Sequence, residues 1–86
     1  MPTISRFYGL VIAMYFNDHE PAHFHVEHDD REAKVRIDTL EVIDSNLSSR
    51  DLRLALAWAE LHQAEHLENW TLARSGDTLR AIEPLR

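Results

Sequence analysis

The sequence predicts an α+β fold, in which a small antiparallel β-meander of four to five strands packs against a C-terminal helical hairpin. Apolar and polar residues alternate with a period of two in the N-terminal half, as in half-buried strands. After Ser48 the apolar residues recur at helical spacing. No linker or internal repeat divides the 86 residues, so we expect a single domain over residues 1–86.

The N-terminal half contains the predicted strands. Gly9 is expected to join the first two strands, and Pro21, which cannot extend a ladder, belongs to a predicted turn over residues 17–21. The third and fourth strands are predicted to form a hairpin with a polar turn at residues 29–32. The expected strands are residues 3–7, 10–16, 23–28, 33–38 and 40–43, and residues 79–82 are expected to add a short edge strand.

The C-terminal half contains the predicted helices. Ser48 is the expected N-cap of the first helix, because Asp51 follows at the third helical position, as in a short capping box. The polar stretch at residues 62–65 is expected to bend or break the helical segment. Apolar residues then continue at helical spacing to Gly76, the predicted C-cap.

Composition narrows the function classes. The chain has 9 Lys and Arg against 15 Asp and Glu, a formal net charge of −6, so a neutral or basic protein partner fits better than a phosphate backbone. The absence of cysteine excludes disulfides, thiolate zinc sites and cysteine nucleophiles. No apolar run is long enough for a membrane-spanning helix, and residues 1–6 lack a secretory signal. We therefore expect a cytoplasmic protein.

Histidine is the unusual residue type, with six copies, and its densest cluster follows Asp18. On a strand over residues 23–28, His23, His25 and Glu27 share one face and the alternate residues face the core. In an assumed hairpin register, His25 lies beside Arg36 and His23 beside Asp38.

Two imidazoles next to a guanidinium are the ingredients of acid–base chemistry on a phosphodiester. His23 and His25 are therefore candidate catalytic residues, with Arg36 as an electrostatic clamp. Alternatively, His23 and His25 hold zinc together with His19, since His-x-His on a strand aims two nitrogens at one point. Asp18 and Glu27 are further candidate ligands. A third interpretation is a solvated histidine face without a site.

Other polar and aromatic residues are assigned structural roles. His62 and His66 have the helical spacing of a shared metal site, but Gln63 stands where zinc proteases carry a glutamate. Both histidines are therefore interpreted as solvated helix residues. Trp58 and Trp70 lie on apolar stripes and are predicted to belong to the core.

Several blocks of the chain match the pattern of a known family. They are residues 1–9, Tyr15-Phe16-Asn17-Asp18-His19-x-Pro21-x-His23-Phe24-His25-Val26, and residues 40–43, 58–62, 68–73 and 82–85. With these blocks the chain resembles small prokaryotic proteins catalogued as a domain of unknown function, some of which are described as DhiT-type toxins of type II toxin–antitoxin pairs. Members usually carry a second proline at the position of Ala22. The resemblance implies a cytoplasmic bacterial protein with a small antitoxin protein as its partner.

Three function classes follow as expectations. A toxin acting on RNA would use His23 and His25 for proton transfer and Arg36 for charge stabilisation. A non-enzymatic binding or regulatory module would dock a partner protein through its sheet edge or helices, and an exposed edge would also permit a homodimer. A zinc-binding protein would use the histidine cluster. No other cofactor and no membrane partner is expected.

Overall fold

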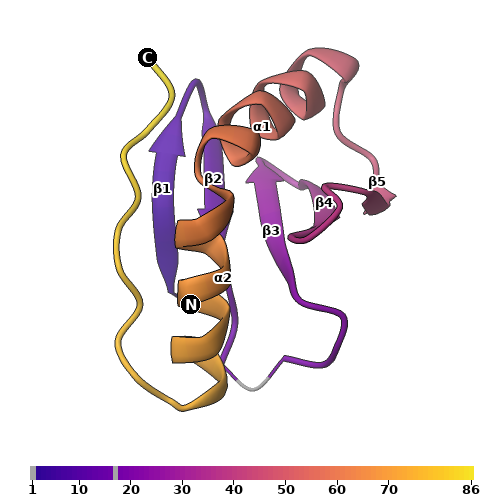
Figure 1. Cartoon of the computed structure of the whole chain (residues 1–86). Coiled ribbons are helices and arrows are strands. Elements are labelled where there is room, and N and C mark those ends of the chain that lie inside the picture. Colours follow the sequence, from indigo (N-terminus) through magenta and orange to yellow (C-terminus); the bar gives the residue numbers. More distant parts are fainter. Residues whose placement is uncertain (1, 17) are drawn as a thin grey trace.

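An antiparallel meander followed by two helices forms the chain (Figure 1), in a computed structural model that describes residues 2–16 and 18–86. Neighbouring strands in the sheet follow the chain order β1-β2-β3-β4-β5. The predicted α+β class is confirmed. The elements are β1 (Thr3–Phe7), β2 (Leu10–Ala13), β3 (His23–His28), β4 (Arg31–Arg36), β5 (Val42–Ser45), α1 (Ser49–Leu61) and α2 (Gln63–Arg74).

Gly9 makes the first hairpin turn, as predicted. Tyr8 and Gly9 both have positive φ values, 50° and 83°, which is the backbone geometry of a tight two-residue hairpin. A Cβ atom at Gly9 would also lie 3.2 Å from Nε2 of His28, so the position combines an unusual backbone with little space. Glycine satisfies both constraints.

The turn between β3 and β4 is shorter than predicted, and this changes the register. Only residues 29 and 30 separate the two strands, with Asp29 at a φ of 57°. His23 therefore pairs with Arg36, and His25 pairs with Lys34. The register assumed from the sequence is wrong by two residues. Because two is the period of a strand, the same side chains still share a face.

Two other strands are also displaced from their predicted bounds. β2 ends at Ala13, whose partner in β3 is His25, and the chain then leaves the ladder before residues 14–16. β5 begins at Val42 and not at Leu40, because Leu40 has a φ of 60°, outside the extended region. Asn17, which belonged to the predicted turn, lies outside the described residues.

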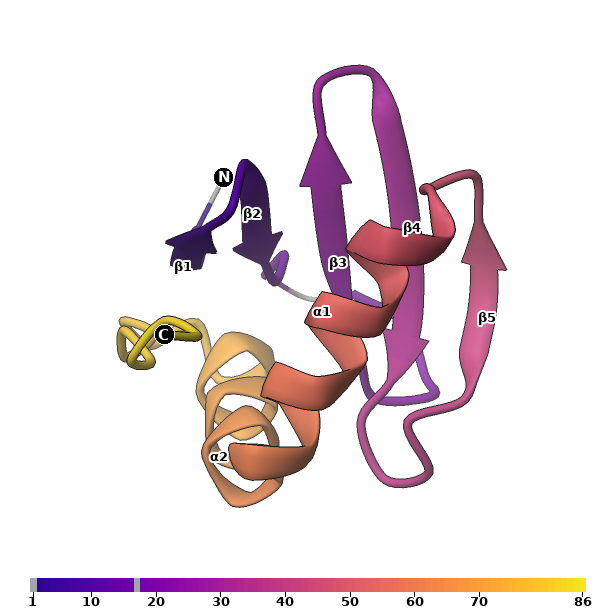
Figure 2. The same cartoon turned by 90° about the horizontal axis from the view of Figure 1, so that it is seen from above.

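Both helices cover the same face of the sheet (Figure 2). The side chain of Ser48 accepts a hydrogen bond from the backbone N–H of Asp51 at 3.1 Å, which confirms the predicted N-cap. The helical segment breaks at His62, and Gly76 follows the second helix with a φ of 75°. Neither helix in the described residues is long and apolar enough to cross a membrane.

The C-terminal segment runs beside β1 without forming a strand (Figures 1 and 2). The edge strand predicted at residues 79–82 is therefore wrong, although Ile82 donates a backbone hydrogen bond to Ile4 at 3.0 Å. The indole Nε1 of Trp58 donates to the carbonyl of Glu83 at 2.7 Å. A backbone hydrogen bond to β1 and a polar contact from a core residue thus both hold this segment in place.

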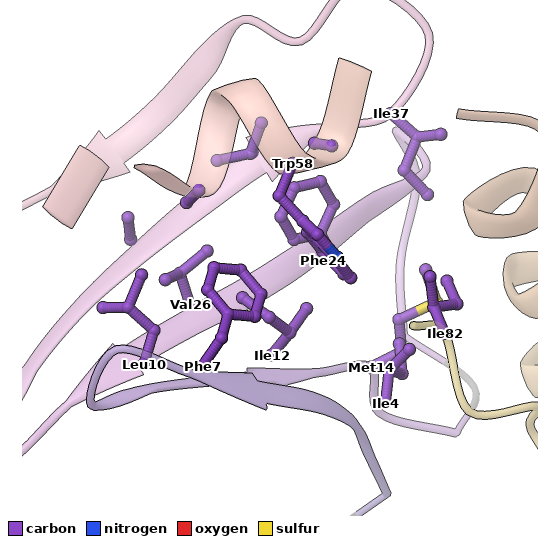
Figure 3. Packing of buried hydrophobic residues seen from close by; sticks show 14 of the residues in the cluster. Ile4, Phe7, Leu10, Ile12, Met14, Phe24, Val26, Ile37, Trp58 and Ile82 are labelled. Atoms are coloured by element: carbon purple, nitrogen blue, oxygen red, sulfur yellow. The ribbon is translucent and has the colours of Figure 1, made fainter. Parts of the chain in front are cut away.

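The hydrophobic core fills the space between the sheet and the helices (Figure 3). Trp58 is fully buried, and its ring centre lies 5.1 Å from that of Phe7 and 6.3 Å from that of Phe24. Trp70 is also buried, so both tryptophans are core residues as predicted. Other buried members are Ile4, Leu10, Ile12, Met14, Val26, Ala33, Val35, Ile37, Ala55, Ala59 and Ile82.

His66 also lies in this core, so its assignment as a solvated residue is wrong. Its ring stacks on Phe24 with centres 4.5 Å apart and meets Trp58 edge-on at 4.7 Å. Neither ring nitrogen has a hydrogen-bond partner in the described part of the chain. Burial, with a smaller contribution from the charge of His62, lowers the pKa of His66 to about 4, and Glu65 opposes the shift.

Replacing His66 with leucine should make stability less dependent on pH between 6.5 and 4. The unfolded chain binds a proton on this imidazole below its ordinary pKa of 6.5, whereas the folded chain does so only near pH 4. Folding therefore loses about 1.4 kcal/mol per pH unit as the pH falls through this window. Urea unfolding at pH 7 and pH 5 should show a smaller difference for His66→Leu than for wild type. Replacement of the exposed His19 by Gln is the control, and an unchanged difference in His66→Leu would contradict this account.

Asp51 connects the sheet to the first helix. Its buried carboxylate accepts from Nδ1 of His28 at 2.6 Å and from Nη1 of Arg50 at 2.9 Å. The hydrogen bond from His28 is the main reason that the pKa of Asp51 is lowered, and burial opposes it. The contact joins the end of β3 to the first turn of α1.

We expect Asp51→Ala to lower the free energy of unfolding by about 2 kcal/mol at pH 7, because charged hydrogen bonds are lost. The effect should shrink in acid, since the contribution of a carboxylate with a lowered pKa is present above its ordinary pKa of 3.8 and lost below. Asp30→Ala, in the exposed turn, is the matched control. Equal unfolding midpoints for the two variants would show that the contact between Asp51 and His28 does not stabilise the fold.

Candidate metal centre

Strand β3 separates the core from the candidate site. Phe24 and Val26 are fully buried against the helices, while His23 and His25 point to the other face. These two histidines are nevertheless only 3% and 7% exposed. The interpretation of a solvated histidine face is therefore wrong for them, and the polar atoms of both rings need partners inside the protein.

Neighbouring segments provide the cover over these two rings. The ring of Tyr15 meets His25 edge-on with centres 4.5 Å apart, and the ring of Trp70 lies 5.4 Å from that of His23. Asp18, from the loop between β2 and β3, places its carboxylate between the two imidazoles. The site thus combines one strand, one loop and one helix.

The Asp18 carboxylate lies close to both histidines. Its Oδ2 atom is 3.0 Å from Nε2 of His23 and 3.2 Å from Nε2 of His25. The three ligand atoms all lie within 4.8 Å of one another. Tetrahedral zinc, with bonds of about 2.0–2.1 Å, holds its ligand atoms about 3.3 Å apart. The spacing of these atoms therefore suits a first-row metal ion.

A backbone carbonyl determines the protonation of His23. Nδ1 lies 2.7 Å from the carbonyl oxygen of Pro21, which can only accept, so Nδ1 carries a proton. Nε2 then faces the carboxylate of Asp18. A neutral Nε2 has a lone pair there, and two lone pairs repel each other unless a proton or a metal cation lies between them. Metal-bound histidines usually donate their second N–H to such a carbonyl or carboxylate.

Asp18 is an ionised carboxylate at neutral pH. Burial raises its pKa, but the hydrogen bond from His25, the backbone N–H of His19 and the nearby charges of His23 and His25 outweigh that effect. The resulting pKa lies below its ordinary value of 3.8. An ionised oxygen next to two imidazole nitrogens is a suitable ligand for a divalent cation.

The remaining candidate residues lie around this cluster. His19 is exposed, with Nδ1 3.1 Å from Oδ1, the second oxygen of Asp18, and its ring centre lies 5.8 Å from that of His23. Arg36 is opposite His23 in the sheet, but its guanidinium makes two hydrogen bonds to Asp38, at 2.6 and 3.1 Å. The structure thus brings Asp18, His23 and His25 together, whereas the guanidinium of Arg36 is paired with Asp38 and not with the histidines.

Several acidic side chains lie near the cluster, and Lys34 is the residue opposite His25 in the sheet. Burial raises the pKa of Tyr15, and the charges of Glu27, Glu32 and Asp18 raise it further. Glu27 and Glu32 lie directly opposite each other in the sheet. Glu32 also approaches His25, with Oε1 3.7 Å from Nδ1. The turn predicted from the sequence includes Glu32, but the observed turn spans only residues 29 and 30 and places Glu32 on β4.

Two surface clefts in the described part of the chain lie away from this cluster. One, of about 300 Å³, is lined by residues from the β3–β4 turn and the start of α1, including His28 and Asp51. The other, of about 330 Å³, lies between α1 and the C-terminal segment next to Trp58. Asp18, His23 and His25 line neither of these two clefts.

Comparison with curated proteins gives no match, and comparison with solved structures gives none either. A family model matches residues 9–71, which include β2 to β5, α1 and the whole Asp18–His23–His25 cluster. The family description assigns no function and does not mention a toxin. The toxin role expected from the resemblance therefore stays a prediction. The chain belongs to the family described as Domain of unknown function (DUF4160).

Proposed function

We propose that this protein binds a divalent first-row transition metal ion, with zinc as the first candidate, through Asp18, His23 and His25. The observation that carries the proposal is the fixed tautomer of His23. Its Nδ1–H donates a hydrogen bond to the carbonyl of Pro21. The lone pair of Nε2 in this tautomer is therefore directed at an ionised carboxylate oxygen 3.0 Å away. A cation between these two atoms would remove the repulsion between the lone pair of Nε2 and the carboxylate. The same cation could also bind the nearby Nε2 of His25.

Two imidazoles and one carboxylate leave part of the coordination sphere open. Catalytic zinc sites have three protein ligands and keep a further position for water or substrate. His19 is the nearest additional ligand from the sequence analysis, and its exposed ring lies on the solvent side of Asp18. If His19 were a fourth ligand, the centre would be closed; with three protein ligands, a bound ion would supply Lewis-acid activation of a water molecule.

Local charges favour a cation over metal-free catalysis on RNA. Arg36, the expected phosphate clamp, is neutralised by Asp38. Three carboxylates, those of Asp18, Glu27 and Glu32, act on the neighbouring Tyr15. Such a surface attracts metal ions and repels a polyanion. The toxin role, an antitoxin partner, RNA as substrate and a homodimer remain predictions.

Titration with Zn²⁺ should show one site in the wild type. His25→Ala and Asp18→Asn should each weaken binding by more than about 100-fold, because each removes a ligand atom. Affinity should also fall in acid, since both imidazoles must be neutral to bind the ion. Calorimetry at pH 7.5 and pH 5.5 measures both effects, and saturating metal should raise the unfolding free energy by about 2.7 kcal/mol at 100 times Kd.

Two variants make this titration selective. His62→Ala removes a histidine outside the cluster and should bind Zn²⁺ as the wild type does. His19→Ala should weaken binding less than His25→Ala if His19 is an exposed fourth ligand. Near-ultraviolet circular dichroism of Trp58 and Trp70 checks that each variant is folded. A wild type that binds none of Zn²⁺, Mn²⁺ and Fe²⁺ would rule out the proposal.

Inducing the chain in a bacterial host tests the toxin prediction separately. If toxicity depends on the cluster, wild type should arrest growth and a folded His23→Ala/His25→Ala variant should not, because the double variant lacks both imidazoles. Growth curves and viable counts after induction give the measurement. Arrest by both chains would place the toxic activity outside the cluster, and growth of both would remove support for a toxin.

A further inference from the structure

The second nitrogen of His25 has no hydrogen-bond partner in the described chain, although the ring is 7% exposed. In the metal-free arrangement a neutral His25 ring donates from Nε2 to the Asp18 carboxylate at 3.2 Å, and the lone pair of that tautomer is on Nδ1. If a metal ion takes the lone pair of Nε2, the proton must lie on Nδ1 instead. Metal binding therefore creates a buried N–H group that needs an acceptor.

Glu32 is placed to be that acceptor. Its Oε1 lies 3.7 Å from Nδ1 of His25, just beyond hydrogen-bonding distance. Its side chain is 43% exposed, so it can turn without disturbing the core. Glu32 stands opposite Glu27, and His25 stands opposite Lys34. Glu32 is thus the diagonal cross-strand neighbour of His25, a distance that a long side chain spans.

We propose that Glu32 is the outer carboxylate of the metal centre, which accepts the Nδ1–H of His25 when the ion is bound. The inference rests on the proposed function and deepens it. A buried N–H without a partner costs about 1–3 kcal/mol, so the protein needs this acceptor only in the metal-bound state. Closing the gap from 3.7 Å to hydrogen-bonding distance couples the position of Glu32 to occupancy of the site.

The neighbouring Glu27 favours this movement. Two carboxylates directly opposite each other in a sheet repel, and Oε1 of Glu27 is buried with no partner among the described residues. Turning Glu32 toward an imidazole N–H replaces a repulsive contact with an attractive one. The two histidines thus use different acceptors. Nδ1 of His23 donates to a backbone carbonyl, whereas Nδ1 of His25 would donate to the partly exposed side chain of Glu32.

Zn²⁺ binding to Glu32 variants tests the inference. Glu32→Ala should lower Zn²⁺ affinity by about 10–100-fold, the usual effect of losing an outer acceptor. Glu32→Gln should give a smaller loss, because its amide oxygen still accepts a hydrogen bond. Glu60→Ala, which removes the same charge from an exposed position on α1, should bind as the wild type does.

Nuclear magnetic resonance on protein with ¹⁵N-labelled histidine separates this role from a general loss of stability. In Zn²⁺-loaded wild type, His25 should show a slowly exchanging, downfield Nδ1–H resonance. In Glu32→Ala the resonance should move upfield and exchange faster, while the Nδ1–H of His23 stays unchanged on the carbonyl of Pro21. This contrast between two rings in one protein provides an internal reference.

The outcomes distinguish the two proposals. Wild type that binds no Zn²⁺ overturns both the metal centre and the role of Glu32. Wild type that binds Zn²⁺, together with a Glu32→Ala variant of equal affinity and an unchanged His25 Nδ1–H, overturns the role of Glu32 and leaves the metal centre standing. A loss of affinity and a shifted resonance in Glu32→Ala, with Glu60→Ala like wild type, supports both.

Discussion

The alternation of side chains along β3 is the constraint on which the rest of the structure depends. β3 is the middle strand of the sheet, and it has neighbours on both sides. Phe24 and Val26 contribute to the core, and His23 and His25, from the same strand, form the polar cluster. Because successive residues point to opposite faces, the position of the histidines is determined by how the core packs. The strand that builds the core therefore also positions the two histidines of the site.

The cluster itself depends on pairing buried polar atoms. His23 and His25 are nearly inaccessible, so each nitrogen without a partner lowers stability. A carbonyl and a carboxylate oxygen are hydrogen-bond partners of two of the four ring nitrogens, Nδ1 of His23 at 2.7 Å and Nε2 of His25 at 3.2 Å. Nε2 of His23 lies 3.0 Å from Asp18, and a cation or a proton between these atoms would complete that contact. The fourth nitrogen is Nδ1 of His25. Its proposed acceptor, Glu32, lies nearby but just beyond hydrogen-bonding distance.

His66 shows that burial by itself does not indicate a site. It is as buried as the cluster, yet its surroundings are the aromatic rings of Phe24 and Trp58, with no polar partner in the described residues. Its imidazole is held neutral by desolvation, whereas His23 and His25 share an ionised carboxylate. The set of partner atoms, more than the degree of exposure, separates a structural histidine from a candidate ligand.

The sequence by itself determined the class of the fold, the strand that carries His23 and His25, and the capped start of the first helix at Ser48. These are local properties, set by the period of two in a strand and by a side chain that reaches its own helix. Sequence reasoning missed the burial of His66 and the register of β4. The break at His62 rotates the second helix relative to the first, and a two-residue turn moves Glu32 onto the strand. The burial of His66 depends on its packing against Phe24, which lies far away in the chain, whereas the register of β4 depends on the local turn. Only the tertiary structure could show that Asp18 contacts both imidazoles and that Glu32 approaches the remaining nitrogen. The reason is that the loop carrying Asp18 and the strand carrying Glu32 come together at β3 through packing, which local spacing in the sequence does not determine.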